Sequence, residues 1–127
     1  MFRIDGMSRT PVYEQLIDQV ERLVGGGILS PGDQLPSVRS LSIELSINPN
    51  TIQKAYSELD SRGIVRSVPG KGCFVSEDAG ESLKKAGMEK LYELTDKVCE
   101  LSAAGVTRDE IMEAVQKGLK NNERNKL

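Results

Sequence analysis

A chain of 127 residues, with 38% apolar side chains and a formal net charge of −2, can bury one modest core. The balanced charge excludes a simple polybasic tail, and the apolar runs are too short to span a membrane. Histidine is absent, so the two cysteines, Cys73 and Cys99, cannot complete a zinc site within one chain. They can form a disulfide or stay reduced. We expect reduced thiols in a cytoplasmic protein that has no signal peptide, metal or cofactor.

The first predicted helix spans residues 12–24 and ends at three glycines, 25–27. A proline-glycine turn follows. A short second helix is then predicted over about 38–45, with Ser37 as its N-terminal cap. The residues expected on the buried faces of these two helices are Val12, Leu16, Val20, Leu23, Val24, Val38, Leu41 and Leu45.

The segment "SINPNTIQKAYSEL", residues 46–59, predicts a third helix, with Asn48 as its cap and Pro49 at its first position. Its end is predicted near Gly63. The first turn carries no acid, although the partial positive charge of a helix N-terminus usually attracts Asp or Glu. By contrast, the helix predicted to begin after Thr107 has two acids there. A docked phosphate backbone would supply the missing negative charge and would be repelled by acids.

Two short runs of β-forming residues, 64–68 and 73–75, flank a "PGKG" turn at 69–72 and predict a hairpin. The order helix, helix, short turn, helix, hairpin is that of a winged helix-turn-helix. We therefore predict a mostly α protein with a small β-hairpin (α+β). Residues 1–76 would form the winged helix-turn-helix, and a two-helix C-terminal extension would follow it.

The remainder is predicted to be a linker at 77–81, a helical dimerisation region at 82–121 and a disordered tail at 122–127. Thr107 and Glu110 predict a capping box for the last helix. The two helices either cap the winged core or pair with a second copy. We favour pairing, because two isolated helices bury little surface. The residues expected at the dimer contact are Leu91, Leu94, Val98, Leu101, Ile111 and Val115.

The start of the third helix suits DNA recognition. In a helix-turn-helix, the second helix enters the major groove and reads base edges with its N-terminal side chains. Asn50, Thr51 and Gln53 suit base edges, and the amine of Lys54 suits a phosphate. The alternative is a surface helix with solvated polar residues. Arg39 lies in the first turn of the preceding helix, where a cation works against the helix dipole. Contact with a DNA phosphate or a guanine edge would offset this cost. The alternative is an exposed arginine whose stem covers apolar surface.

The "PGKG" turn can also meet DNA. Gly70 and Gly72 would let a hairpin tip approach a neighbouring backbone, and Lys71 supplies a charge, although a plain tight turn has the same composition. Residues 37–76 hold five Lys or Arg and three Asp or Glu, a local net charge of +2. The chain contains no P-loop spacing and no visible nucleophile–base pairing, so we expect no enzyme.

Several motifs together carry a family resemblance: Pro11-x-Tyr13, Gly27-x-Leu29-x-Pro31-Gly32-Asp33, Leu35-Pro36-Ser37-x-Arg39, Asn48-Pro49-Asn50-Thr51, Ala55-Tyr56-x-x-Leu59 and Gly70-Lys71-Gly72. With them, residues 8–76 closely resemble the GntR family of bacterial transcription regulators. The short two-helix remainder is similar to the YtrA-type subfamily, in which such a tail serves mainly for dimerisation.

The resemblance also implies roles for single residues. Tyr56 matches a family tyrosine that reaches a phosphate or, equally, packs in the core. Ser42, Ser46 and Cys73 depart from the Ala, Gly and Thr that the family more often has. The residues for which the resemblance and the helix pattern imply DNA contacts are Ser37, Arg39, Asn48, Pro49, Asn50, Thr51, Gln53, Lys54, Tyr56, Gly70, Lys71 and Gly72.

We therefore predict a cytoplasmic, homodimeric, sequence-specific DNA-binding transcription regulator. We favour a repressor, although the sequence alone does not distinguish a repressor from an activator. Its partners would be a double-stranded, pseudo-palindromic operator and a second copy of the chain, with no membrane and an unknown small-molecule effector. The resemblance implies control of a transporter operon and of its own gene. The alternative is a winged-helix protein-interaction module without DNA binding.

Overall fold

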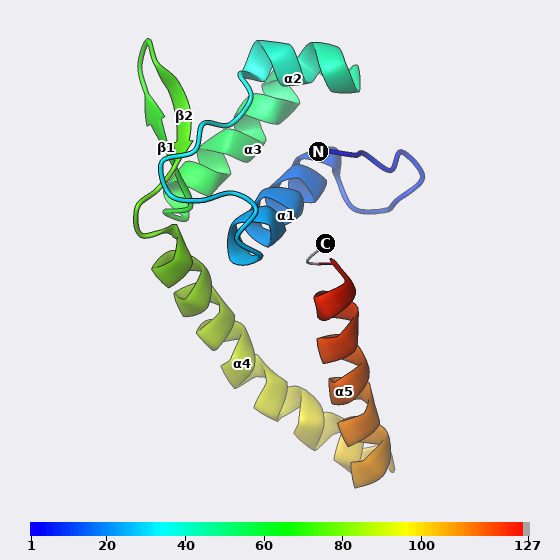
Figure 1. The fold of residues 1–127 in the computed structure, drawn as a ribbon. Coiled ribbons are helices and arrows are strands. Elements are labelled where there is room, and N and C mark those ends of the chain that lie inside the picture. Colours follow the sequence, from blue (N-terminus) through cyan, green and yellow to red (C-terminus); the bar gives the residue numbers. More distant parts are fainter. Residues whose placement is uncertain (126–127) are drawn as a thin grey trace. The chain divides into compact units, whose positions relative to one another are not determined.

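The computed structural model describes residues 1–125 (Figure 1) and divides into two compact units, Met1–Leu83 and Lys84–Leu127. The predicted fold class, mostly helical with one hairpin, is confirmed. None of the helices in the described part of the chain is both long and apolar enough to cross a membrane. In chain order the elements are α1 (Val12–Gly25), α2 (Val38–Leu45), α3 (Pro49–Ser61), β1 (Val65–Val68), β2 (Gly72–Val75), α4 (Ala79–Ala103) and α5 (Arg108–Asn125).

The core of the first unit is built around α1 and α3, which pack side by side and run in the same direction. Two contacts show the shared direction of the two helices. Tyr13 of α1 contacts Lys54 of α3, and two turns further along Glu21 pairs with Arg62. The core is aliphatic, as the scarcity of aromatic residues predicts. Its largest fully buried side chains are Leu16, Val20, Leu41, Ile52, Leu59 and Ile64.

The turn between α2 and α3 is held by two serines. Ser46 ends α2 in the left-handed conformation, with φ at 55°, and its N–H bonds to the carbonyl of Ser42. The hydroxyl of Ser42 donates to the carbonyl of Ile47 at 2.5 Å. Glycine adopts the left-handed conformation without steric cost, so the Gly that the family resemblance led us to expect at position 46 would also suit this turn.

The hairpin pairs β1 with β2 in antiparallel register, Val65 opposite Val75 and Val68 opposite Gly72. Its tip is a tight turn in which the N–H of Lys71 donates to the carbonyl of Val68 at 2.9 Å. Gly70, at the third position of this turn, has a positive φ of 78°. A type II turn requires a positive φ at that position.

The loop between α1 and α2 adds a further pairing to the hairpin, which the sequence pattern did not predict. Gln34 forms an isolated antiparallel bridge with Phe74, and the N–H of Leu35 donates to the carbonyl of Cys73 at 2.8 Å. In Figure 1 this loop, in blue to cyan, passes alongside the hairpin.

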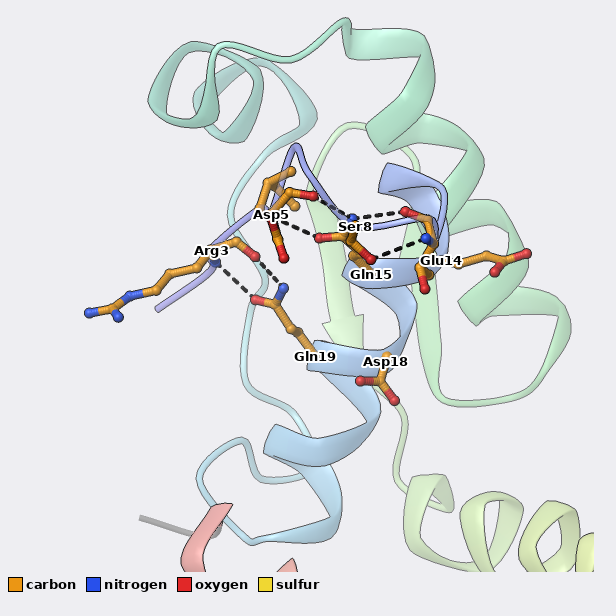
Figure 2. Close-up of a pocket in the computed structure, with 9 residues that line it drawn as sticks. Arg3, Asp5, Ser8, Glu14, Gln15, Asp18 and Gln19 are labelled. Carbon is orange, nitrogen blue, oxygen red and sulfur yellow. Dashed lines mark hydrogen bonds between the residues drawn. The ribbon is translucent and has the colours of Figure 1, made fainter. Parts of the chain in front are cut away.

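The N-terminal arm before α1 is also ordered. Phe2 is buried in the core. Gln19 of α1 bonds to both the N–H and the carbonyl of Arg3, and Gln15 does the same for Asp5 (Figure 2). Two glutamines one helical turn apart thus hold the arm against α1 as a neighbouring strand would, beside the open polar pocket of Figure 2.

The expected linker at 77–81 differs from the structure, because α4 begins at Ala79. The side chain of Ala79 is fully buried in the core, and Leu83 packs against that core. Gly63 lies so close to Ser82 that an added Cβ would come 2.8 Å from the serine hydroxyl. The first turn of α4 therefore belongs to the winged unit, anchored there by Ala79 and Leu83, while Gly80 and Glu81 are exposed.

The expected disordered tail at 122–127 also differs, because α5 continues through Asn125. Residues 126–127 lie outside the described part of the chain. The predicted capping box at the start of α5 is confirmed: the N–H of Glu110 donates to Thr107 Oγ1 at 3.2 Å, and Glu110 Oε1 accepts from the N–H of Thr107 at 3.0 Å. The carboxylate of Glu110 accepts from both the N–H and the hydroxyl of Thr107, and these two bonds lower the pKa of Glu110.

Residues 84–123 of the second unit form no buried core. Among residues 84–123, Val98, Val106 and Ile111 are half-buried and every other residue is exposed. α4 and α5 are joined by a short turn at Gly105 and splay apart from it (Figure 1). The large exposed apolar side chains on these two helices are Met88, Leu91, Tyr92, Leu94, Leu101, Met112, Val115 and Leu119.

Candidate nucleic-acid interface

The N-terminus of α3 has the predicted cap and an acid-free first turn. Asn48 Oδ1 accepts from the N–H of Asn50 at 2.9 Å, and Pro49 occupies the first turn. The side chains of Asn50 and Gln53 are exposed, and Thr51 is half-buried beside them. A capped helix start that presents amide and hydroxyl groups can approach DNA with its partial positive charge uncompensated.

The start of α2 repeats this arrangement. Ser37 Oγ accepts from the N–H of Ser40 at 3.0 Å, which confirms Ser37 as the cap, and the first turn has no acid. Arg39 is exposed and forms no ion pair with any described residue. Each of the other three helices has at least one acid in its first turn. α2 and α3, the two helices of the helix-turn-helix, are therefore the exceptions.

The buried hydroxyl of Tyr56 fixes the start of α2 to α3. Tyr56 is 3% exposed, and its hydroxyl donates to the carbonyl of Pro36 at 2.7 Å. Burial raises the pKa of this phenol well above its usual value. Of the two roles that the sequence left open, the structure supports core packing rather than contact with a phosphate. Tyr56 holds the residue immediately before the Ser37 cap.

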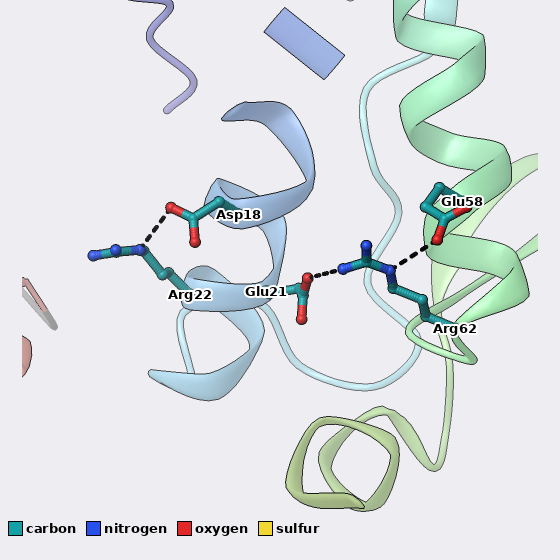
Figure 3. A network of polar contacts seen from close by, with 5 residues as sticks. All are labelled: Asp18, Glu21, Arg22, Glu58 and Arg62. Carbon is teal, nitrogen blue, oxygen red and sulfur yellow. Dashed lines mark hydrogen bonds and ion pairs between the residues drawn. The ribbon is translucent and has the colours of Figure 1, made fainter. Parts of the chain in front are cut away.

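Two cations near α3, Arg62 and Lys54, differ in whether their charge is paired with an acid. Arg62 is engaged within the fold, donating to Glu21 of α1 at 2.7 Å and to Glu58 at 3.1 Å (Figure 3). Lys54, predicted to meet a phosphate, holds its amine 3.8 Å from the centroid of the Tyr13 ring. A cation–π contact orients the lysine without neutralising its charge, so the amine keeps its suitability for a phosphate.

The hairpin tip presents Gly70, Lys71 and Gly72, all exposed. Both glycines have positive φ, 78° at Gly70 and 127° at Gly72. Lys71 forms no ion pair with any residue between 1 and 125. The tip therefore offers an uncompensated charge on a backbone that only glycine accommodates readily.

The structure thus places the residues predicted for DNA contact at the α2 start, at the α3 start and on the hairpin, all in the first unit. The six residues predicted for dimerisation lie in the second unit. Of these, Val98 and Ile111 are half-buried, and the other four are 38–50% exposed. The sequence reasoning missed Tyr13 and Gln34, whose side chains contact Lys54 and the hairpin tip. A period-based pattern contains no signal for either contact.

Three helices with a hairpin wing, and an acid-free, capped helix-turn-helix on their surface, define a winged helix-turn-helix DNA-binding domain. Residues 12–75 match the family described as "Bacterial regulatory proteins, gntR family". The chain belongs to the GntR family and is a DNA-binding transcription regulator rather than an enzyme.

Known relatives resemble the chain along most of its length. It is 40% identical to the HTH-type transcriptional repressor YtrA of Bacillus subtilis (strain 168), over 91% of this chain and 90% of YtrA. A transcriptional antiterminator from Listeria monocytogenes EGD-e has a similar fold, with a TM-score of 0.78, 30% identity and coverage of 96% and 92% of the two chains. The DNA-binding domain of AraR, solved with operator ORX1, matches 59% of this chain and 93% of its own, with a TM-score of 0.53 and 27% identity.

Proposed function

We propose that this protein acts in the cytoplasm as a homodimeric repressor that binds a pseudo-palindromic operator. The observation that carries the proposal is the pair of capped helix starts, at Ser37 and Asn48, that lack acids where the other helices have them. A DNA phosphate supplies the negative charge that each start lacks. The AraR domain, which shares the fold, was solved bound to an operator.

Within this surface, each group has a distinct task. Asn50, Thr51 and Gln53 read base edges in the major groove, since amide and hydroxyl groups match the donors and acceptors there. Arg39 reaches a phosphate or a guanine edge from the start of α2, and Lys71 meets the backbone from the wing. These tasks combine sequence reading with positioning on the duplex.

The second unit supplies the dimer. Because residues 84–123 bury no side chain fully, α4 and α5 gain a core only from a partner. Leu91, Leu94 and Leu101 lie on one face of α4 at spacings of three and seven residues, which suits packing against another helix. A symmetric dimer then presents two recognition helices about one DNA turn, ~34 Å, apart.

The repressor role is supported by the name of the relative YtrA, a transcriptional repressor similar along nearly the whole chain. A dimer seated on its operator would exclude polymerase. By the resemblance to YtrA-type regulators, the proposed targets are a transporter operon and the gene of the protein itself. Release requires an effector or condition that binds the free and the DNA-bound states differently.

The test is a footprint on the DNA upstream of the protein's own gene, at two salt concentrations, with Arg39→Ala beside the wild type. We expect protection of two half-sites about one helical turn apart, weakened by salt and weakened by about 1–3 kcal/mol in the variant if Arg39 reads a base. Arg22→Ala is the control, because Arg22 is an exposed α1 arginine paired with Asp18 (Figure 3). If a folded dimer protects nothing there and a random-sequence selection also fails, the protein is an interaction module instead.

A further inference from the structure

The side chain of Gln34 reaches from the α1–α2 loop to the tip of the hairpin. Its Nε2 donates to the carbonyl of Lys71 at 3.1 Å, across 37 residues of sequence. The backbone of Gln34 is fixed as well, because it bridges Phe74 on β2. The amide group is therefore aimed at the tip from an anchored position.

The two glycines of the tip differ in their surroundings. An added Cβ at Gly70 would meet nothing within 4 Å, whereas at Gly72 it would come 2.6 Å from Gln34 Nε2. The Gln34 amide occupies the space that a side chain at position 72 would need. The tip is thus open on the Gly70 side and supported by Gln34 on the Gly72 side.

The segment that carries Gln34 also leads directly into the start of α2. Leu35 donates its N–H to Cys73 on β2, and Pro36 accepts the Tyr56 hydroxyl of α3 at 2.7 Å. The next residue is Ser37, the cap of α2. Three successive residues are therefore tied in turn to the hairpin tip, to β2 and to α3.

We propose that Gln34 is a positioning residue for DNA binding, which fixes Lys71 of the wing relative to the start of α2. This inference rests on the proposed DNA-binding function. A tip held in place before DNA arrives does not lose conformational entropy on binding, so the Lys71 contact contributes fully to affinity. Without the Gln34 bond the tip moves independently, and the phosphate contact by Lys71 is lost or weakened.

The test measures operator affinity against salt for Gln34→Met, which keeps an unbranched side chain of similar length and removes the donor. We expect affinity to fall about twofold to tenfold, the range for one hydrogen bond. We also expect the salt slope to flatten by up to about one, as for Lys71→Ala. In a Lys71→Ala background, Gln34→Met adds no further loss.

The matched control is Gln19→Met, the same substitution at a glutamine that also donates to a backbone carbonyl, that of Arg3. It should leave the salt slope unchanged. Amide exchange in the free protein provides a readout without DNA: Gln34→Met speeds exchange at Lys71, and Gln19→Met does not. Operator binding by Gln34→Met with an unchanged slope, or a loss additive with Lys71→Ala, overturns the role of Gln34 alone. A wild type without salt-dependent binding overturns the proposed function, and this inference with it.

Discussion

The two units of this chain differ in how far their apolar side chains are buried. In the winged unit, residues from the arm, three helices, both strands and the first turn of α4 meet in one core. In the second unit, not one side chain of residues 84–123 is fully buried, and large apolar groups remain exposed along α4 and α5. The first unit has the means to fold alone. The second has the composition of half a core, and in the function proposed above a second copy supplies the other half.

The largest expected effect comes from placing charge on the face of α4 that would pack in the dimer. Leu94→Asp combined with Leu101→Asp should give monomers, because each buried leucine contributes about 1.5–3 kcal/mol and a dimer contains four such positions. Sedimentation measures the change in mass, and helical circular dichroism should fall as α4 and α5 lose their partner.

The pair Cys99→Asp and Ala103→Asp is the control for that variant. These exposed residues lie on the side of α4 away from Leu91, Leu94, Val98 and Leu101. They add the same charge outside the row of leucines, so the dimer should persist. A dimer that survives Leu94→Asp with Leu101→Asp would locate the interface elsewhere and would remove the contrast between the units.

A cavity in the winged unit should have the converse effect. Ile52 of α3 is fully buried, so Ile52→Ala should lower the stability of this unit by about 2–5 kcal/mol. Thermal unfolding measures the loss, and sedimentation below the transition should still give dimers. If Ile52→Ala dissociates the dimer while the winged unit stays folded, the two units do not bury their surfaces independently.

A second contrast lies between two helix starts, and exchanging their charges tests it. Asn50 and Asp109 each follow a cap by two residues, Asn50 in α3 and Asp109 in α5. Asn50→Asp should stabilise the free protein by about 0.3–1 kcal/mol, because an acid complements the helix dipole. It should also weaken operator binding by about 1–3 kcal/mol, through repulsion of phosphate and loss of the amide donor.

The reverse exchange, Asp109→Asn, should destabilise α5 slightly and leave operator affinity unchanged. Denaturant unfolding and a binding titration measure the two effects for each variant. If Asn50→Asp and Asp109→Asn change operator affinity alike, the acid-free start of α3 has nothing to do with DNA.

The sequence pattern predicted the elements and the caps because these depend on neighbours in the chain. Ser37, Asn48 and the Thr107–Glu110 box all act within three residues. It failed where a contact joins distant segments. The linker was expected at 77–81 because "SEDAGE" is polar and contains glycine, yet Ala79 is helical, since the core buries it.

The candidate site divides in the same way. The residues at the starts of α2 and α3 could be chosen from local sequence and from the family resemblance. The roles of Tyr56 and Gln34 could not, because each depends on a hydrogen bond to a backbone carbonyl at least 20 residues away. At the edge of the buried face of a helix, the sequence pattern is the same whether the tyrosine there is buried or exposed. The pattern therefore could not decide the role of Tyr56.

The smallest expected effect concerns Ser46, in the turn that joins the two helix starts. A non-glycine residue in the left-handed conformation costs roughly 1–2 kcal/mol, and glycine costs about 0.5–1 kcal/mol in added freedom of the unfolded chain. Ser46→Gly should therefore stabilise the winged unit by about 0.5–1 kcal/mol in denaturant unfolding. Ser40→Gly, the same substitution at a helical position of α2, should destabilise it by a similar amount. If both variants destabilise equally, Ser46 is not strained, and its left-handed conformation does not favour glycine at this position.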